Sequence, residues 1–291
     1  METLQQVLLD PLAFAFMQRA LIGAVLIGMT CGVVGAYVVT RGLSFLGDAL
    51  AHSILPGVAL VYISGNTSQG AVLFGGLVAG VVSALGIGFL TRGQRLQEDT
   101  AIGIIFAGML ALGIAIISSS RSFATDLQHI IIGNILAVGT TDLLLIAAIG
   151  ALVLLLVALF YKELLVSAFD PVLAETLRLP NEALRVGMII LLAITIVVST
   201  QGAGVVMATA MLIIPSSVAR LLTHRLHWMM LLGAFIGAGC GIVGLYVAWH
   251  LNIAASASIV LTMTALFIVV FLFAPQRGYV WSLLGWSAHK A

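Results

Sequence analysis

The stretch RGLSFLGDALAHSILPGVALVY, residues 41–62, combines a long apolar run with two ionisable side chains. Asp48 and His52 are four residues apart, a spacing that places both on one face of a helix. If the helix begins near Gly42 and rises about 1.5 Å per residue, Asp48 lies roughly 9 Å deep and His52 roughly 15 Å deep. A hydrocarbon core is about 30 Å thick, so His52 is expected near its middle. Because an ionisable group inside a bilayer is costly, we predict that this pair is a functional site.

The other expected spans carry no ionisable residue away from their ends, so Asp48 and His52 stand apart. A buried acid–imidazole pair that only pins a helix crossing is the alternative. Pro56, four residues beyond His52, cannot donate to the His52 carbonyl and clashes with it. We therefore expect that carbonyl to turn toward a cavity beside the two side chains.

The composition indicates a polytopic membrane protein. Of the 291 residues, 62% are hydrophobic and only 8% are charged, which excludes a soluble domain. A formal net charge of +1 argues against nucleic acid as a partner. Cys31 and Cys240 both fall in apolar stretches, which suggests neither a disulfide framework nor a thiolate metal cluster. No nucleotide-binding or hydrolase motif occurs, so the chain is not expected to be an enzyme or to power pumping by itself.

We expect an all-α protein whose residues 1–291 form a single transmembrane domain. Residues 1–17 are predicted to be an interfacial lead-in. Only Arg41 and a few neighbours separate the first two apolar spans, so eight and nine transmembrane helices both remain open. The nine spans are expected at 18–40, 43–63, 70–90, 100–119, 141–160, 184–200, 203–222, 228–250 and 257–274.

The lysines and arginines predict the orientation, because they are enriched on the cytoplasmic side. With the 91–99 loop in the cytoplasm, ten of the twelve lysines and arginines lie inside. Arg19 and Arg121 remain outside. The N-terminus is therefore expected outside and the C-terminus inside. Asp142 is interpreted as an ordinary interfacial residue.

The longest inner connection, 161–185, contains a short capped helix. Asp170 is expected as its N-cap and Pro171 in its first turn, and Pro180 ends it. Such a helix on the cytoplasmic face suits the docking of a soluble partner, although an ordinary connector is the alternative. The docking residues are predicted to be Asp170, Pro171, Val172, Leu173, Glu175 and Leu177.

The segment RGLSFLGDALAHSILPGVAL resembles the signature of the metal-ion permeases of ABC transporters, the bacterial importers of zinc, manganese and iron. FDPVLAETLRLP resembles the coupling helix of that family and, more distantly, that of the cobalamin and siderophore importers. The family often has glycine where this chain has Arg178. Three further stretches that resemble the family are DLQHIIIGNILAV at 126–138, VVMATAMLIIPSSVARLLTHR at 205–225 and NIAASASIVLTMTALFIVVFLFAPQRG at 252–278.

The resemblance implies the permease subunit of an ATP-driven importer of divalent metal ions in the bacterial cytoplasmic membrane. Its implied partners are a second copy of the chain, a cytoplasmic ATPase that binds the ATP, an extracytoplasmic metal-binding protein and membrane lipid. The chain itself is expected to hold no cofactor, only the transported metal. Asp126 and His129, at the outer face, are candidates for receiving that metal, and a solvated loop pair is the alternative.

A carboxylate oxygen with an imidazole nitrogen suits Mn²⁺, Fe²⁺ or Zn²⁺ and disfavours Cu⁺. One chain supplies only Asp48 and His52, but a two-fold dimer with a central pore would supply four ligands. The DLQH stretch resembles the manganese and iron branch of the family more than the zinc branch, and manganese is the expected cargo, with zinc or iron as alternatives. A self-sufficient metal channel or secondary carrier is the alternative function. An intramembrane metalloenzyme fits poorly, because its zinc site needs three protein ligands and a catalytic carboxylate.

Overall fold

The computed structural model describes residues 10–65, 68–94, 96–119, 133, 135–169 and 171–274, and over these residues all regular structure is helical. The long helices are α2 Ala15–Arg41, α5 Gln69–Thr91, α6 Glu98–Ser118, α8 Thr140–Leu159, α11 Asn181–Ala203, α12 Val205–Leu222, α13 Leu226–Leu251 and α14 Ala255–Phe273. The shorter elements are α3 Ser44–Ser53, α4 Leu55–Ile63, α9 Tyr161–Phe169, α10 Pro171–Thr176 and the single turns Pro11–Ala13, Arg92–Gln94 and Ile135–Ala137.

Nine helical spans among the described residues are long and apolar enough to cross a membrane, and α3 with α4 forms the second of them. Of the two counts that the sequence left open, eight and nine, the described residues show nine. The first two spans are separate because Gly42 adopts φ 75°, a left-handed conformation that ends α2 and turns the chain. α2 begins at Ala15, so it takes in the last residues of the expected 1–17 lead-in.

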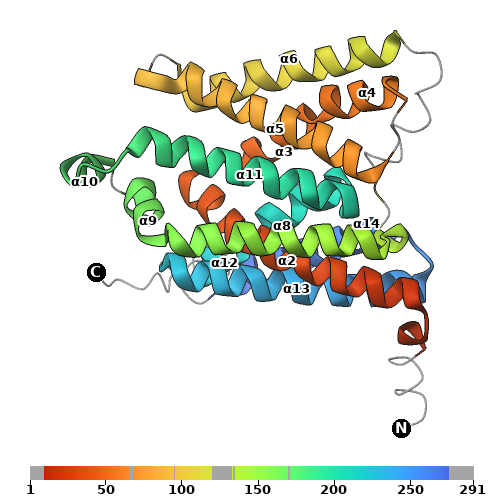
Figure 1. The fold of residues 1–291 in the computed structure, drawn as a ribbon. Helices are drawn as coiled ribbons and strands as arrows, with labels where there is room; N and C mark the ends of the chain where they lie inside the picture. Colours follow the sequence, from red (N-terminus) through yellow and green to blue (C-terminus); the bar gives the residue numbers. More distant parts are fainter. Residues whose placement is uncertain are drawn as a thin grey trace.

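The helices form two groups on either side of α11 (Figure 1). α4, α5 and α6 pack together in one group, whereas α2 packs with α8, α12 and α13 in the other. α14 packs against α12 and α13. α3 contacts α5 and α6 on one side and α11 and α12 on the other, so the helix that carries Asp48 and His52 lies between the two groups.

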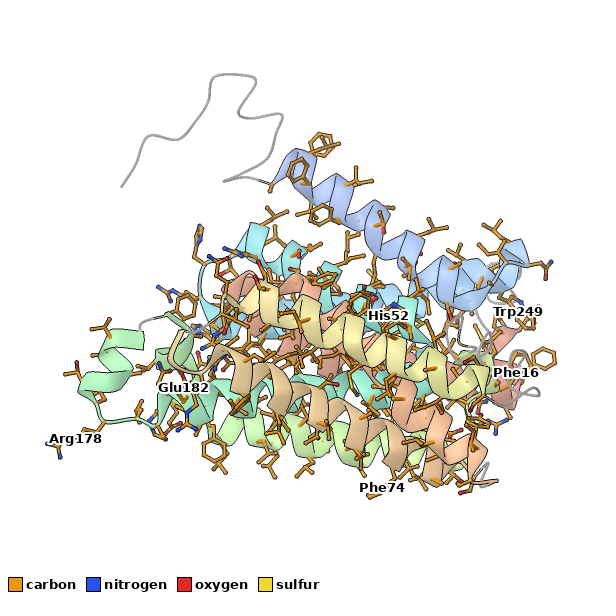
Figure 2. All side chains as sticks on the ribbon, turned by 90° about the horizontal axis from the view of Figure 1, so that it is seen from above. Phe16, His52, Phe74, Arg178, Glu182 and Trp249 are labelled. Carbon is orange, nitrogen blue, oxygen red and sulfur yellow. The ribbon has the colours of Figure 1, made fainter. Side chains whose placement is uncertain are left out.

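The two ends of the bundle differ in the way expected of inner and outer membrane faces. Arg220, near the end of α12, donates to the carbonyl of Val39 at the end of α2. At the opposite end, Phe16 and Trp249 lie with their ring centroids 6.2 Å apart, and Figure 2 shows them far from Arg178. Arginines at one end and aromatic rings at the other agree with a cytoplasmic face and an outer interface.

α2 and α13 approach each other closely through glycines. A Cβ atom on Gly28 would lie 2.6 Å from the carbonyl carbon of Gly237, and one on Gly32 would lie 2.4 Å from that of Gly233. Both distances are far inside van der Waals contact, so only glycine permits this approach of the two backbones. In a bilayer, where apolar burial between helices gains little over lipid contact, such close packing is a main source of helix association.

Gly237→Ala is expected to destabilise the folded protein, because the added Cβ would lie 2.6 Å from the Gly28 carbonyl oxygen. The cost of overpacking is about 1–3 kcal/mol. Gly239→Ala is the matched control on the same helix, since a Cβ there meets no atom within 4 Å and alanine favours the helix. Thermal unfolding of the purified variants measures the difference. An equal loss in both variants would contradict the close glycine contact.

Candidate functional site

The backbone changes direction directly after the Asp48/His52 pair. α3 ends at Ser53 and α4 begins at Leu55, with Pro56 in the first turn of α4. A proline fits there because the N–H groups of a first turn have no partner within the helix. The carbonyl of His52, which Pro56 leaves without its helical donor, accepts the N–H of Ile54 at the break.

Asp48 and His52 lie together on α3, with 3.8 Å between the carboxylate Oδ1 and the imidazole Nε2. Their side chains are partly open, with 44% of Asp48 and 29% of His52 exposed. This confirms that the two groups share one face. The distance is long for a hydrogen bond, so each group keeps lone pairs available for another ligand.

Helix α6 borders the pair. The ring of His52 lies 5.9 Å from that of Phe106, and Phe45 meets the same Phe106 ring edge-on at 5.9 Å. Figure 2 shows His52 beside this helix. α6 therefore lies against the His52 side of this face through the Phe106 ring.

A metal site in one chain alone would be incomplete. Among the described residues there is no group of three or more His, Cys, Asp or Glu side chains that could hold a metal ion. Asp48 and His52 supply one oxygen and one nitrogen donor, which match the preferences of Mn²⁺, Fe²⁺ and Zn²⁺. Any further protein ligand has to come from another chain or from outside the described residues.

A cavity of about 490 Å³ begins just beyond the helix break, between α4, α5, α8 and α11. Its lining includes Gln69, Asp142 and Gln201. Asp142 is more than an interfacial residue: its Oδ2 accepts the backbone N–H of Gly139 and the side-chain N–H of Gln69, each at 2.9 Å. The Gly139 contact follows from helix-start spacing, whereas the partner on α5 has no signal in the local sequence.

The other two sets of predicted residues stand differently. Asp126 and His129 lie outside the described residues. The inner connection forms the expected short helix α10, although Asp170 and the side chains of Pro171 and Glu175 are also outside the described part. The predicted apolar docking residues are exposed. The exposed fraction is 74% for Val172, 44% for Leu173 and 56% for Leu177.

Arg178 closes α10 in a conformation that favours glycine. Its φ is 56°, in the left-handed region that glycine adopts without a Cβ penalty. The chain then returns through the N–H of Leu179, which donates to the carbonyl of Ala174 at 2.9 Å. The arginine at this position therefore keeps the backbone turn that follows α10.

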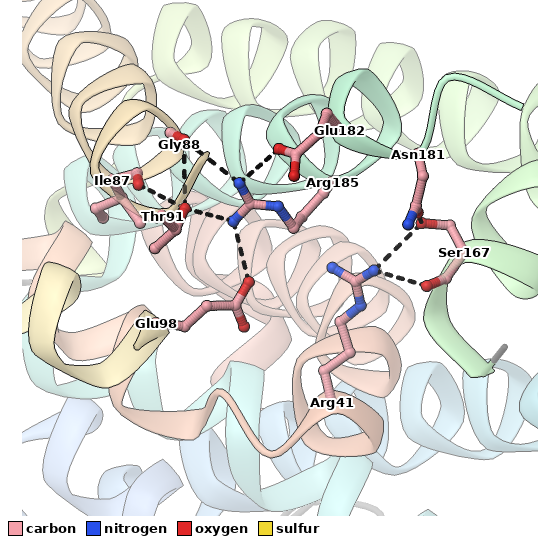
Figure 3. Close-up of polar contacts among 9 residues, drawn as sticks. All are labelled: Arg41, Ile87, Gly88, Thr91, Glu98, Ser167, Asn181, Glu182 and Arg185. Atoms are coloured by element: carbon pink, nitrogen blue, oxygen red, sulfur yellow. Dashed lines mark hydrogen bonds and ion pairs between the residues drawn. The ribbon is translucent and has the colours of Figure 1, made fainter. Parts of the chain in front are cut away.

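The base of this inner loop is joined by hydrogen bonds that the sequence did not reveal (Figure 3). The Ser167 hydroxyl, just before the loop, donates to Oδ1 of Asn181, just after it, at 2.5 Å. Arg41, at the end of α2, donates to the carbonyl of Ser167 at 2.9 Å. The loop thus leaves and re-enters the bundle at one fixed point beside α2.

Comparison with known proteins decides the family. The sequence profile of the ABC 3 transport family matches residues 13–274. This chain belongs to the ABC 3 transport family. The nine apolar spans among its described residues make it a multi-pass membrane protein, which in a bacterium lies in the cytoplasmic membrane.

Relatives of this permease are similar over nearly their whole length. The manganese transport system membrane protein MntC of Listeria monocytogenes is 44% identical, over 92% of this chain and 94% of MntC. The chelated iron transport system membrane protein YfeD of Yersinia pestis is 33% identical, over 94% of this chain and 90% of YfeD. The fold is similar to that in PsaBC from Streptococcus pneumoniae in complex with Fab, with a TM-score of 0.83, 37% identity, and coverage of 97% of this chain and 99% of that one.

If the Asp48/His52 face lines a water-filled path, a cysteine at position 52 will react with a hydrophilic thiol reagent in lipid vesicles. The thiolate that reacts forms only where water reaches the side chain. Ser53→Cys is the matched control, because Ser53 is only 1% exposed. Native Cys31 and Cys240 are buried and are replaced by alanine to remove background. If His52→Cys reacts with the reagent as slowly as Ser53→Cys does, the Asp48/His52 face is covered by lipid or protein.

Proposed function

We propose that the chain is the membrane-spanning permease subunit of an ATP-driven importer of divalent transition-metal ions, with manganese as the main cargo and zinc or iron as alternatives. The observation that carries the proposal is the partly open Asp48/His52 pair on a membrane-spanning helix. An oxygen and a nitrogen donor at this depth are costly to keep unless they serve a path for a cation. Relatives named for manganese and for chelated iron transport support the same class of cargo.

The proposed transport site forms between two copies of the chain. Each copy would bring one carboxylate and one imidazole to a two-fold axis, which gives four ligands. Two observations support this assembly: the pair is partly open, and the described residues of one chain contain no larger ligand cluster. Ligands shared between two chains separate when the chains move, so the ion is held only transiently, as a transporter requires.

The importer needs two further partners. A cytoplasmic ATPase supplies the energy, since this sequence has no nucleotide-binding motif. An extracytoplasmic metal-binding protein delivers the ion, with Asp126 and His129 as its proposed receiving residues. Membership of an ABC transport family supports this assembly over a self-sufficient channel or secondary carrier. The two classes differ in one measurable respect, because only the ABC importer loses uptake when its ATPase is removed.

Asp48→Asn and His52→Ala are each expected to abolish manganese uptake by cells, because each removes a ligand donor from both halves of the shared site. Expression level and assembly should stay normal, since both side chains are partly exposed and neither fills the core. Asp99→Asn is the control, because it removes an exposed carboxylate at the inner end of α6. Radioactive Mn²⁺ uptake at limiting metal gives the measurement. Normal uptake by both site variants would exclude this pair from the path.

Leu173→Glu is expected to lower the amount of ATPase that co-purifies with the chain. The exposed apolar residues of α10 and its end, Val172, Leu173 and Leu177, form the proposed docking surface, and a charge there opposes an apolar contact. His224→Glu places the same charge on an exposed residue of another inner loop and serves as the control. Retention of the ATPase at the normal ratio by Leu173→Glu would place the docking surface elsewhere.

A further inference from the structure

Arg185 joins three helices at the inner end of the bundle (Figure 3). Its Nη1 donates to the Thr91 hydroxyl at 2.6 Å and to Glu98 Oε1 at 3.1 Å. Its Nη2 donates to the Gly88 carbonyl at 3.3 Å and to Glu182 Oε2 at 2.8 Å. One guanidinium thus connects the last turn of α5, the first residue of α6 and the start of α11.

Arg185 is the more buried partner in both of its ion pairs. Its side chain is only 13% exposed, whereas those of Glu98 and Glu182 are 36% and 59% exposed. A planar guanidinium offers several donors in a fixed geometry, so it can hold two helix ends at once. It also lies at the carbonyl end of α5, and Glu98 lies at the N–H end of α6, which are the favourable ends for a cation and an anion.

The inner loop reaches Arg185 through a short rigid path. Asn181, the residue that closes the loop base with Ser167, begins α11, and Arg185 follows four residues later on the same helix. One turn of helix therefore separates the loop base from the guanidinium. A displacement of α10 by a docked partner would move this turn as a unit.

At the other end of the path, α6 borders the transport pair. Phe106 lies eight residues beyond Glu98 on this helix, and its ring meets the ring of His52. A movement of α6 at Glu98 therefore changes the cover over the Asp48/His52 face.

We propose that the Arg185–Glu98 bridge transmits movement of the inner loop, residues 168–180, to α6, and so opens and closes the Asp48/His52 face. This inference rests on the proposed function, since it requires an ATPase docked on α10. Arg185 and Glu98 act as positioning residues that do not touch the metal. Thr91 adds α5 to the same connection, because its hydroxyl bonds the same guanidinium nitrogen.

The two carboxylates on Arg185 provide a matched pair of variants. Glu98→Gln removes a charge that links α11 to α6, at 3.1 Å. Glu182→Gln removes a charge that pairs with Arg185 within α11, at the shorter distance of 2.8 Å. If only the number of ion pairs mattered, the second variant would have at least as large an effect. If transmission between helices matters, only the first will uncouple the protein.

The experiment uses the complex of the full chain with its co-purifying ATPase, reconstituted in lipid vesicles. A spin label on Ser118→Cys, an exposed position at the outer end of α6, reports the ATP-dependent movement of that helix. Cys31 and Cys240 are replaced by alanine in all proteins. ATP hydrolysis, Mn²⁺ uptake and the amount of bound ATPase are measured on the same vesicles.

Glu98→Gln is expected to keep its ATPase but to lose the ATP-dependent label signal, with at least about fivefold less Mn²⁺ transported per ATP hydrolysed. Glu182→Gln should retain both the signal and the ratio. Arg185→Lys keeps the positive charge but loses the planar guanidinium that bonds Glu98 and Glu182 at the same time. It should therefore behave like Glu98→Gln. If Glu98→Gln does not assemble, Arg185→Lys decides the question.

Three outcomes would overturn the proposal. The two glutamine variants could have equal effects, or Arg185→Lys could leave the label signal unchanged. The third is a labelled Ser118→Cys chain with an intact bridge that hydrolyses ATP but shows no ATP-dependent change in the label signal. The label signal does not require a metal. A complex that moves α6 through the bridge but takes up no Mn²⁺ would therefore contradict the proposed cargo and support the proposed bridge.

Discussion

A hydrocarbon interior offers no hydrogen-bond partners, and this constraint organises the whole chain. Backbone groups are satisfied within helices. Many side-chain hydroxyls within the spans do the same, as where Thr30 donates to the Leu26 carbonyl and Ser83 to the Ala79 carbonyl. A few buried hydroxyls also join one helix to another, as where Ser216 on α12 donates to the Gly32 carbonyl on α2 and Ser258 on α14 donates to the Gly244 carbonyl on α13. Close backbone contact adds to these bonds, as between Gly32 on α2 and Gly233 on α13.

The contacts that arginine side chains make between helices lie at the inner end of the bundle, where water is near. Arg185 ties α5, α6 and α11 together there, and Arg41 ties α2 to the base of the inner loop.

The Asp48/His52 pair differs from the arginine contacts, because it lies within a membrane span and both of its side chains are partly exposed. An acid and an imidazole in such a position need water, a cation or another chain on their open side. The break between α3 and α4 directly follows the pair, and α6 lies beside it. The pair and the helix beside it therefore come from different parts of the chain.

The sequence alone determined the parts of this protein that depend on local chemistry. Long apolar runs allow only membrane helices, so the positions of the spans could be predicted, except that the separation of the first two stayed open, and the i,i+4 spacing put Asp48 and His52 on one face. The prolines and the apolar residues around 170–180 predicted the short helix of the inner loop for the same local reason. The tertiary structure decided what pairs with what across long separations: Glu98 with Arg185, Gln69 with Asp142, and Phe106 with His52. These contacts are set by how the helices pack, and packing brings together residues whose separation along the chain carries no periodic signal.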